Sequence, residues 1–392
     1  MHLVSILQIS YKQLEKTKER IWEMNEIKYT YTRERLFSGF DKKSCKVQPV
    51  VAFDGENTAI LSYQKLLLTG IDVMYGVYVA KSTDGGKTFS EPEFQKALSD
   101  TFCDGIRTSY HGMPFYNKKH KKWFGLGRTT PYKNDGKPVL VNGVCAGAYP
   151  LYLSLDAEKG EFTGYSILPF PFEYSIVTTA GQLYEYENGD MLIPFYFRSD
   201  NYPKSTCVTV RYAMEEDGLK IVQVGEPLVA DSYERGVGEP SIAYLNGKFY
   251  MTIRADEVGL YAESDDGFHF SEPKPWVWDD GTVLENYNTQ QHWVGNEKGL
   301  FLAYTRRGAH NDHVFRHRAP IFMTRFDEDR KCLLRDEEVI LVPELGARLG
   351  NFNVIEATQK ESWLMTAEWM QPRGCEKYGS DNSLWRARII WE

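Results

Sequence analysis

Apolar and polar residues alternate along much of this chain in short runs that end in turn residues. The alternation has a period of two, which is typical of β-strands with one buried face. Six times, such a run is followed by a turn rich in Gly, Asn or Lys and then by a second run, as in "EPSIAYL", "NGK" and "FYMTIR" at 239–254. The pattern therefore predicts six copies of one β-hairpin.

The six hairpins keep a constant register. A polar residue opens each first strand and another closes each second strand 15 to 17 residues later, and the units recur about every 61 residues. Turns that arise by chance do not keep such a register, so we interpret the chain as an internal repeat of small sheets. The opening residues are Gln48, His111, Gln182, Glu239, Gln291 and Asn353, and the closing residues are Gln64, Arg128, Arg198, Arg254, Arg306 and Glu368.

Sheets that repeat radially form a β-propeller, which leaves only short and protected edges. Six units fit residues 48–392, and "KYTYTRERLF" at 28–37 is predicted to add an outer strand to the last sheet and close the ring. Seven blades, the alternative, would need units of about 50 residues and would break the register. We expect an all-β fold with one six-bladed propeller over 28–392. A charged amphipathic segment predicts a short helical extension over 1–27.

Composition narrows the class of protein. The formal net charge is −8 with no basic tract to offset it, which argues against nucleic acid as a partner. No apolar run reaches the roughly 18 residues that a membrane span requires. The six cysteines form no CxxC pair and are expected to be free thiols, so neither a metal nor another cofactor is predicted. Oligomeric state stays open.

The first ten residues, "MHLVSILQIS", are mildly apolar but lack a basic region and a clear cleavage site. We therefore predict no signal peptide, and a cytoplasmic location is the default. A misassigned start would allow a secreted or periplasmic protein.

Two turns nearly repeat each other, "KSTDGGKTFSEP" at 81–92 and "ESDDGFHFSEP" at 263–273. The first matches the Asp-box pattern, Ser-x-Asp-x-Gly-x-Thr-Phe/Trp, at every position, while the second is one residue short and lacks the Thr. On these motifs the chain resembles the sialidase-like Asp-box (BNR repeat) propellers, which act on glycans. In that family the box is a structural turn between the third and fourth strands of a blade, and its Asp accepts backbone N–H bonds. The resemblance places the reaction at the channel mouth on the opposite face.

Both polar series fall at that mouth, so the resemblance implies that they line the substrate site. Arginine suits a carboxylate because its guanidinium forms two parallel hydrogen bonds. Glu239 and Arg254 look like the family's Glu and second Arg, and Arg306 or Arg307 resembles the third. Asp104, in the loop after the first Asp-box, stands where the acid is expected.

Two departures from the family pattern point to altered chemistry. Gln48 takes the place of the family's first Arg. The run "RLGNFNV" at 348–354 carries Asn where a nucleophilic Tyr is expected. A relative of the sialidases fits better than a true sialidase.

Several residues are candidates for the chemistry itself. His111, with Tyr110 beside it, is a candidate acid or base, although a lone His is usually structural. Glu239 and Glu368 are expected to face each other as the two carboxylates of a glycosidase, although Glu239 and Arg254 also suit a simple ion pair.

The run "RRGAHNDHVFRHRAP" at 306–320 is the densest polar cluster. We interpret it as a loop over the mouth that reads an anionic sugar; a metal at His310, Asp312 and His313 is less favoured. Trp293 and Trp369 are candidates for stacking on sugar rings, although Trp usually packs between blades. The expected substrate-binding residues are Gln48, Gln64, Lys65, Arg128, Arg198, Arg254, Gln291, His292, Arg306, Arg307, His313, Arg318 and Asn353.

Three functions remain open at this point. The first is a glycoside hydrolase of sialidase-like type that acts on an acidic or deoxy sugar of an oligo- or polysaccharide. The second is a polysaccharide lyase, in which His111 or Tyr110 removes the proton next to a uronate carboxylate. The third is a glycan-binding propeller without chemistry, because a fold alone never proves activity.

Overall fold

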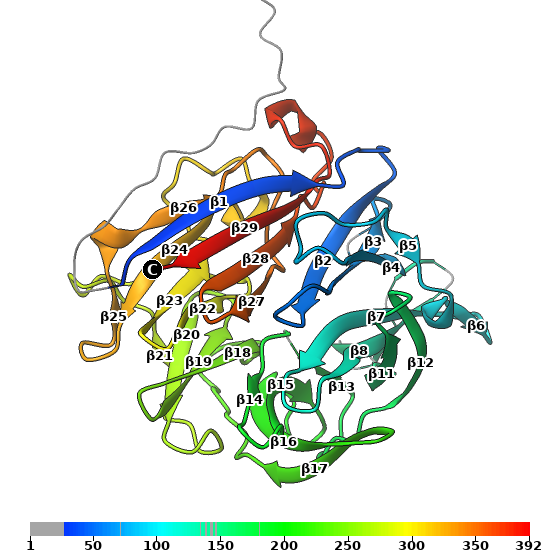
Figure 1. Cartoon of the computed structure of the whole chain (residues 1–392), viewed down its shortest axis with the longest axis horizontal. Coiled ribbons are helices and arrows are strands. Elements are labelled where there is room, and N and C mark those ends of the chain that lie inside the picture. The colour runs from blue at the N-terminus through cyan, green and yellow to red at the C-terminus, as the bar shows by residue number, and fades with distance from the viewer. Residues whose placement is uncertain are drawn as a thin grey trace, which may run out of the picture.

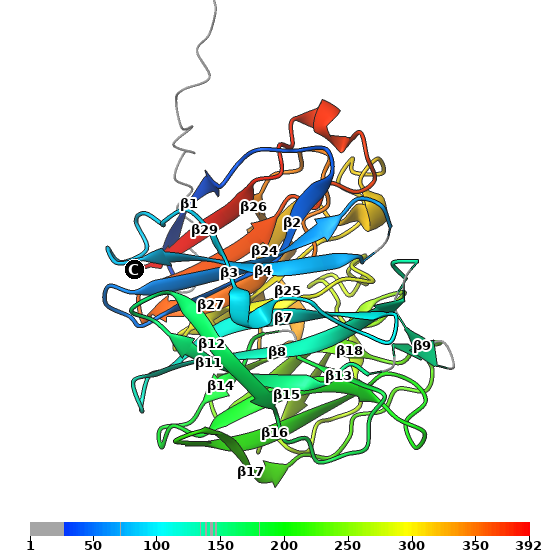
Figure 2. The same ribbon diagram turned by 90° about the vertical axis from the view of Figure 1, so that its right-hand side faces the viewer.

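In the computed structural model, the chain forms a ring of six antiparallel sheets around a central channel (Figures 1 and 2). The structure describes residues 27–392 except 71, 134, 138, 142, 143, 146 and 180. The all-β, six-bladed propeller predicted from the hairpin repeat is confirmed. Of the helix predicted over 1–27, all residues but the last lie outside the described part of the chain. Within the described part of the chain, no helix has the length and apolar character needed to cross a membrane.

Blades 1 to 3 follow one another along the chain, each starting at the channel and running outward. Blade 1 contains β2 (Ser44–Phe53), β3 (Ala59–Leu67), β4 (Met74–Ser82) and β5 (Glu93–Phe94). Blade 2 contains β7 (Ile106–Asn117), β8 (Lys122–Lys133), β11 (Pro150–Asp156) and β12 (Glu161–Ile167), with β6 (Thr101–Cys103) beside β7. Blade 3 contains β13 (Ile176–Thr178), β14 (Tyr184–Glu185), β15 (Met191–Arg198), β16 (Thr206–Glu215) and β17 (Gly218–Val224).

Blades 4 to 6 complete the ring. Blade 4 contains β18 (Gly238–Leu245), β19 (Lys248–Arg254), β20 (Gly259–Ser264) and β21 (Lys274–Pro275). Blade 5 contains β22 (His292–Asn296), β23 (Gly299–Tyr304), β24 (Ile321–Asp327), β25 (Cys332–Leu333) and β26 (Val339–Val342). Blade 6 contains β27 (Asn353–Thr358), β28 (Glu361–Ala367), β29 (Leu384–Trp391) and β1 (Tyr29–Leu36). Smaller elements are the hairpin β9 (Leu140–Val141) and β10 (Val144–Cys145), and the 3₁₀ helices η1 (Lys96–Leu98), η2 (Phe315–His317), η3 (Arg335–Glu337) and η4 (Cys375–Tyr378).

The ring closes through β1, as the sequence predicts. This strand pairs antiparallel with β29 along its whole length, from Tyr29 opposite Trp391 to Leu36 opposite Leu384, and Figure 1 shows the blue and red strands side by side. The last blade therefore takes three strands from one end of the described chain and one from the other.

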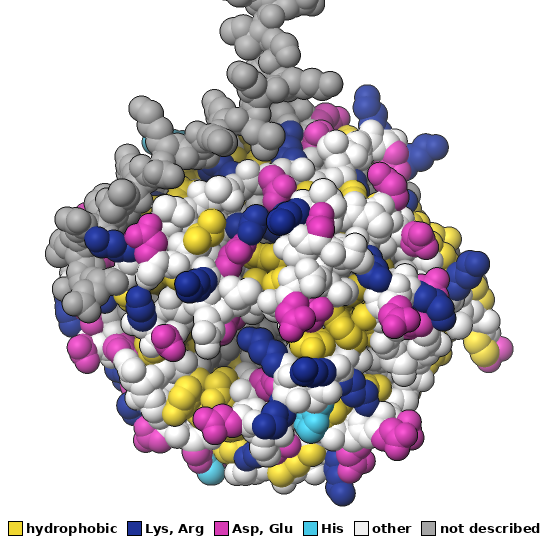
Figure 3. All heavy atoms as spheres, viewed as in Figure 1, with side chains coloured by type: hydrophobic (Ala, Val, Ile, Leu, Met, Phe, Trp, Pro, Cys, Tyr) yellow, Lys and Arg dark blue, Asp and Glu magenta, His cyan; other side chains and the backbone are white. Residues whose placement is uncertain are grey.

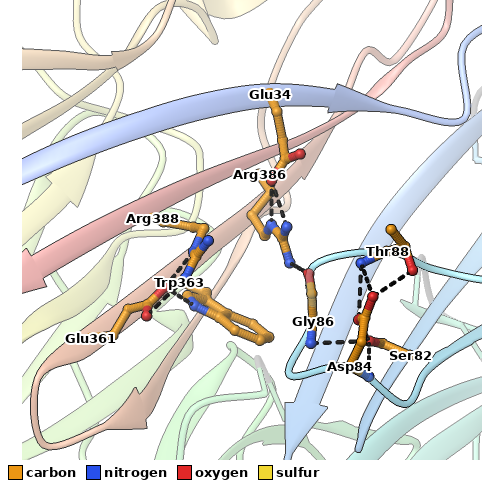
Figure 4. Close-up of polar contacts among 9 residues, drawn as sticks. All are labelled: Glu34, Ser82, Asp84, Gly86, Thr88, Glu361, Trp363, Arg386 and Arg388. Carbon is orange, nitrogen blue, oxygen red and sulfur yellow. Dashed lines mark hydrogen bonds and ion pairs between the residues drawn. The ribbon is translucent and has the colours of Figure 1, made fainter. Parts of the chain in front are cut away.

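The turn after β4 links the first blade to the last (Figure 4). Thr88 donates to the Asp84 carboxylate through its hydroxyl (2.6 Å) and its backbone N–H (3.0 Å), and these bonds, the hydroxyl first, hold the pKa of Asp84 far below its usual value. The carbonyl of Gly86 accepts a hydrogen bond from the buried Arg386 of β29, whose Nη2 also pairs with Glu34 of β1 at 2.5 Å. One arginine thus joins the turn, the last strand and the closing strand.

Candidate functional site

A cavity of about 810 Å³ occupies the channel mouth at which the second strands end. Its walls come from the ends of β8, β15 and β19, from the connections after β3 and before β18, and from η2. In Figure 2 the hairpin with β9, which follows β8 in the chain, marks the side of the molecule on which this cavity lies, at the right of the view. Because every blade ends a strand here, side chains from distant parts of the sequence converge on one space.

The cavity is strongly basic. Eight arginines line it, against three carboxylates, although the whole chain has a net charge of −8. Such a local excess raises the concentration of anions at the mouth and favours their binding. The arginines are Arg128, Arg198, Arg235, Arg254, Arg316, Arg318, Arg348 and Arg373, and the carboxylates are Asp72, Glu239 and Asp256.

Two blades present a polar residue to the cavity in the same way. Gln48 in blade 1 and Glu239 in blade 4 each precede a proline, adopt a left-handed backbone (φ 52° and 48°) and lie in a β-bulge of the first strand. Bulges redirect a side chain at the cost of one ladder position and are common beside active sites. Both bulges therefore lie where the side chains of Gln48 and Glu239 line the cavity.

Glu239 is held ionised by arginine. Its Oε2 lies 2.7 Å from Nη1 of Arg254. Burial alone would raise the pKa of Glu239, but the charge and hydrogen bond of Arg254, followed by the charges of Arg318 and Arg128, lower it below its usual value. A carboxylate in this state accepts hydrogen bonds and stabilises positive charge, but it does not donate a proton near neutral pH.

Asn288 connects three of the arginines. Its side-chain oxygen accepts from Arg254 at 2.5 Å and from Arg316 at 3.2 Å, while Arg318 donates to its backbone carbonyl. Arg316 itself has a left-handed backbone (φ 56°) within η2, a conformation that places strain in the loop at the cavity wall. The guanidinium groups are thereby fixed near one another before any ligand arrives.

Arg318 and a further arginine, Arg348, carry a desolvation penalty. Burial, and then the charge of Arg254, lower the pKa of Arg318 to about 9, and burial lowers the pKa of Arg348 to about 10. Arg348 lies between the rings of Phe315 and Trp369, 5.0 and 4.0 Å from their centroids. A bound anion would relieve this cost, because opposite charge favours the charged form.

The other two carboxylates differ in environment. Asp256 accepts hydrogen bonds from both Nε and Nη2 of Arg235. These hydrogen bonds, together with the charge of Arg235, lower the pKa of Asp256. Asp72 is exposed on the β3–β4 connection, and its charge acts on Arg348 and Tyr132. Of the three, Asp72 is the most exposed residue.

The structure brings six of the predicted site residues to the cavity, together with Trp369. Five of the six, all but Arg318, belong to the repeated register, which supports the reasoning from strand ends. The six are Gln48, Arg128, Arg198, Glu239, Arg254 and Arg318.

Glu368 does not face Glu239 across the mouth, contrary to expectation. It is 1% exposed and accepts hydrogen bonds from the backbone of Asp381 and Ser383 and from the Trp385 indole. Burial, its largest influence, raises the pKa of Glu368. The carboxylate satisfies the backbone of its own blade and is not part of the cavity wall.

His111 and Tyr110 also lie off the cavity wall. The Tyr110 hydroxyl is 3.0 Å from that of Tyr165, in the packing between blades. His111 pairs with Arg128 across two strands, and burial followed by the charge of Arg128 lowers its pKa to about 3. Asp104 is exposed at the β6–β7 turn, away from the residues that line the mouth.

Three polar residues of the register, and His292 beside one of them, turn into the blade interfaces instead. Gln64 donates to the Tyr110 carbonyl at 2.7 Å, and Gln291 accepts from the Trp276 indole at 2.9 Å. His292 contacts the Ser241 hydroxyl, and Asn353 accepts from the backbone of Val51. These side chains serve packing, and none of the four lines the cavity.

The remaining predicted residues lie outside the mouth. Arg306 pairs with Glu338 at 2.5 Å, and Arg307 stacks over Tyr287. His313 contacts Glu344 at 3.0 Å, and Lys65 lies over the Tyr78 ring. Trp293 is buried and lies against a second cavity, described below. Within the described chain, no group of three or more His, Cys, Asp or Glu side chains is placed to hold a metal ion.

Six of the eleven charged residues of the cavity wall were not predicted from the sequence. Asp72, Arg235, Asp256, Arg316, Arg348 and Arg373 come from connections between strands, which do not follow the repeat. Arg316 and Arg348 stand within the two runs singled out at 306–320 and 348–354, so the clustering of polar residues there was the available signal.

Comparisons with known proteins add the class of fold. No protein-family model and no curated protein sequence matches the chain. Its structure is similar to a protein of unknown function from Dyadobacter fermentans, with a TM-score of 0.65 and 17% identity over 92% of this chain and 99% of that one. It is also similar to the K499G mutant of NanB sialidase from Streptococcus pneumoniae (TM-score 0.55, 11% identity, 91% and 70% covered) and to Penicillium chrysogenum α-L-arabinanase complexed with arabinobiose (TM-score 0.55, 12% identity, 92% and 98% covered).

These similarities define the class: the chain has the six-bladed propeller fold that sialidases and arabinan-degrading enzymes share. Its structural neighbours include glycoside hydrolases. At these identities the likeness concerns the fold, so the activity has to be argued from the site.

Proposed function

We propose that this protein is a glycoside hydrolase that acts on a carboxylate-bearing sugar bound in the arginine-lined cavity. The observation that carries the proposal is the set of eight arginines around one cavity of about 810 Å³ in an acidic protein. A cavity of this size suits one to a few sugar rings. The substrate carboxylate supplies the negative charge that the three wall carboxylates leave uncompensated.

Arg254, Arg318 and Arg348 are proposed to bind the carboxylate. Arg254 is already aligned by Glu239 and Asn288, so little side-chain freedom is lost when the ligand binds. Arg318 and Arg348 gain most from an anion because burial disfavours their charge.

Asp72 is proposed as the proton donor to the leaving group. It is an exposed residue of the cavity wall, whereas Glu239 and Asp256 are each engaged by hydrogen bonds from an arginine. Glu239 then supplies the fixed negative charge that stabilises a sugar ring as positive charge develops on it. The lyase built on His111 is less favoured, since that residue is off the cavity wall and its low pKa makes it a weak base.

The test begins with substrates. 4-Methylumbelliferyl glycosides of glucuronic, galacturonic and nonulosonic acids are compared with neutral arabinofuranosides and fucosides, by fluorescence. Uronate polymers are followed at about 235 nm, where the unsaturated product of a lyase absorbs. Hydrolysis of an acidic glycoside supports the proposal, whereas turnover of neutral glycosides alone, or absorbance without hydrolysis, contradicts it. Binding without either product indicates a glycan-binding propeller.

Two matched variants then test the residues. Arg254→Met should lower kcat/KM by roughly 30-fold to several thousand-fold, the range for losing a buried charged contact. Arg306→Met removes an arginine from a similar Arg–Glu pair outside the cavity and should leave kcat/KM nearly unchanged.

Asp72→Asn should slow a substrate with a sugar leaving group far more than an aryl glycoside, because an aryl leaving group needs little protonation. Asp104→Asn is the control. Equal losses on both substrates would remove Asp72 from the role of acid.

A further inference from the structure

A second cavity, of about 750 Å³, lies at the other end of the channel. All six blades contribute to it, through the ends of the first strands and the turns that follow them. Figure 3 shows this face, which is hollowed near its centre. The proposed hydrolytic site does not use any of these residues.

The two cavities are separated inside the channel. Gln182 of blade 3 reaches blade 5, where its Nε2 donates to the Trp293 carbonyl at 2.7 Å and its Oε1 accepts from the Trp293 N–H at 3.0 Å. Because blade 4 lies between these blades in the ring, the bridge crosses the channel. The two cavities have no lining residue in common.

The wall of the second cavity is aromatic and partly exposed. Phe53, Phe115, Tyr116 and Tyr184 are half-buried, and Tyr244 is 44% exposed. Large aromatic surfaces grouped in one concavity of a folded protein mark a binding site more often than chance exposure. Their flat faces suit the C–H faces of sugar rings.

Polar groups are interleaved with these rings. Glu185, Glu187, Glu297 and Glu356 face two lysines, Lys118 and Lys119, so the wall carries more negative than positive charge. This balance disfavours an anionic ligand.

Two buried polar atoms in the same wall have no hydrogen-bond partner among the described residues. They are the Trp293 indole N–H and the Tyr186 hydroxyl. Burying such groups unpaired is costly, so this wall carries hydrogen-bonding capacity that the described residues do not use.

From these observations we infer that the second cavity is a binding site for a neutral oligosaccharide. Aromatic faces together with both donors and acceptors match a ligand whose surface alternates C–H and hydroxyl groups, and the charge balance disfavours an acidic one. The site would hold a neutral stretch of glycan on the face opposite the proposed hydrolytic cavity.

The experiment measures binding of cellobiose, maltose, lactose and arabinobiose by isothermal titration calorimetry and saturation-transfer difference NMR. A glucuronic-acid disaccharide and pentalysine serve as the acidic and basic alternatives. We expect one or more neutral disaccharides to bind, and Tyr244→Ser to weaken that binding by about tenfold. Tyr149→Ser, which alters a tyrosine of similar exposure (48%) outside both cavities, should leave it unchanged.

Arg254→Met separates this inference from the proposed function, because it alters only the first cavity. Neutral binding that survives Arg254→Met and is weakened by Tyr244→Ser supports the second site, whatever the hydrolytic assays give. The inference is overturned if no neutral disaccharide binds, if pentalysine binds in their place, or if binding is lost in Arg254→Met instead.

Discussion

Gly86 is the position where the structure makes its sharpest prediction about stability. It has φ +76°, in the turn that follows β4, and a Cβ there would overlap the Trp363 ring, with further ring carbons at 3.0 and 3.1 Å. Trp363 is 1% exposed and stacked on Phe53, so it has little room to move. The left-handed backbone costs an alanine about 1–2 kcal/mol, and overpacking costs about 1–3 kcal/mol more. Gly86→Ala should therefore lower the free energy of unfolding by about 2–5 kcal/mol.

The neighbouring Gly85 is a matched control. Its φ is +75°, but a Cβ there would meet only the Glu56 carbonyl, at an ordinary 3.5 Å. Gly85→Ala should therefore cost only the backbone term, about 1–2 kcal/mol. Urea unfolding monitored by tryptophan fluorescence gives both values, and repeating Gly86→Ala with Trp363→Leu tests the cause directly. Equal losses for Gly85→Ala and Gly86→Ala, or no relief from Trp363→Leu, would refute the argument from the Trp363 contact.

Three further predictions concern other parts of the ring. Burial lowers the pKa of His292 from 6.5 to about 4, so the unfolded chain binds the proton more readily than the folded chain. The free energy of unfolding should therefore fall as pH falls from 6.5 towards 4, by up to about 3 kcal/mol from this residue. Urea unfolding at pH 7 and 4.5 should show a smaller loss of stability in His292→Gln than in the unmodified protein. Arg386→Met leaves Glu34 and the Gly86 carbonyl without this partner and should lower the free energy of unfolding by about 3 kcal/mol in the same assay. The Arg388–Glu361 pair is more exposed, so Arg388→Met should lower it by about 1 kcal/mol or less. Deleting residues 27–37 removes β1 and bares the edge of β29, so size-exclusion chromatography should show aggregation; a monomeric product with unchanged unfolding would show that blade 6 needs only three strands.

The repeat predicted the fold well because period-two alternation and turn residues are local properties. It predicted the site only in part. A polar residue at the end of a strand can point into the channel or toward the neighbouring blade, and its position in the repeat does not distinguish the two. Arg254 lines the channel mouth, whereas Gln64 turns toward the neighbouring blade and donates a hydrogen bond to the Tyr110 carbonyl.

The connections between strands supplied the rest of the cavity wall. Asp72 and Arg235 belong to loops whose lengths differ from blade to blade, so no register marks them. Their convergence is set by the closing of the ring, which is a property of the whole fold. Residues that share a position within the repeat can therefore be predicted from the sequence, whereas residues that share only a location in space cannot.

The pairing of β1 with β29 has a consequence for the order in which the protein is made. Tyr29–Leu36 leaves the ribosome early, but its partner, Leu384–Trp391, is synthesised last in the ring. At about 5–20 residues per second, β1 waits roughly 20–70 s with an unpaired edge. Its sequence, YTYTRERL, places three charges in succession at 33–35, and charges of this kind keep a lone strand from pairing with a wrong partner. The strand that completes the ring is thus also the one that must remain soluble while it waits.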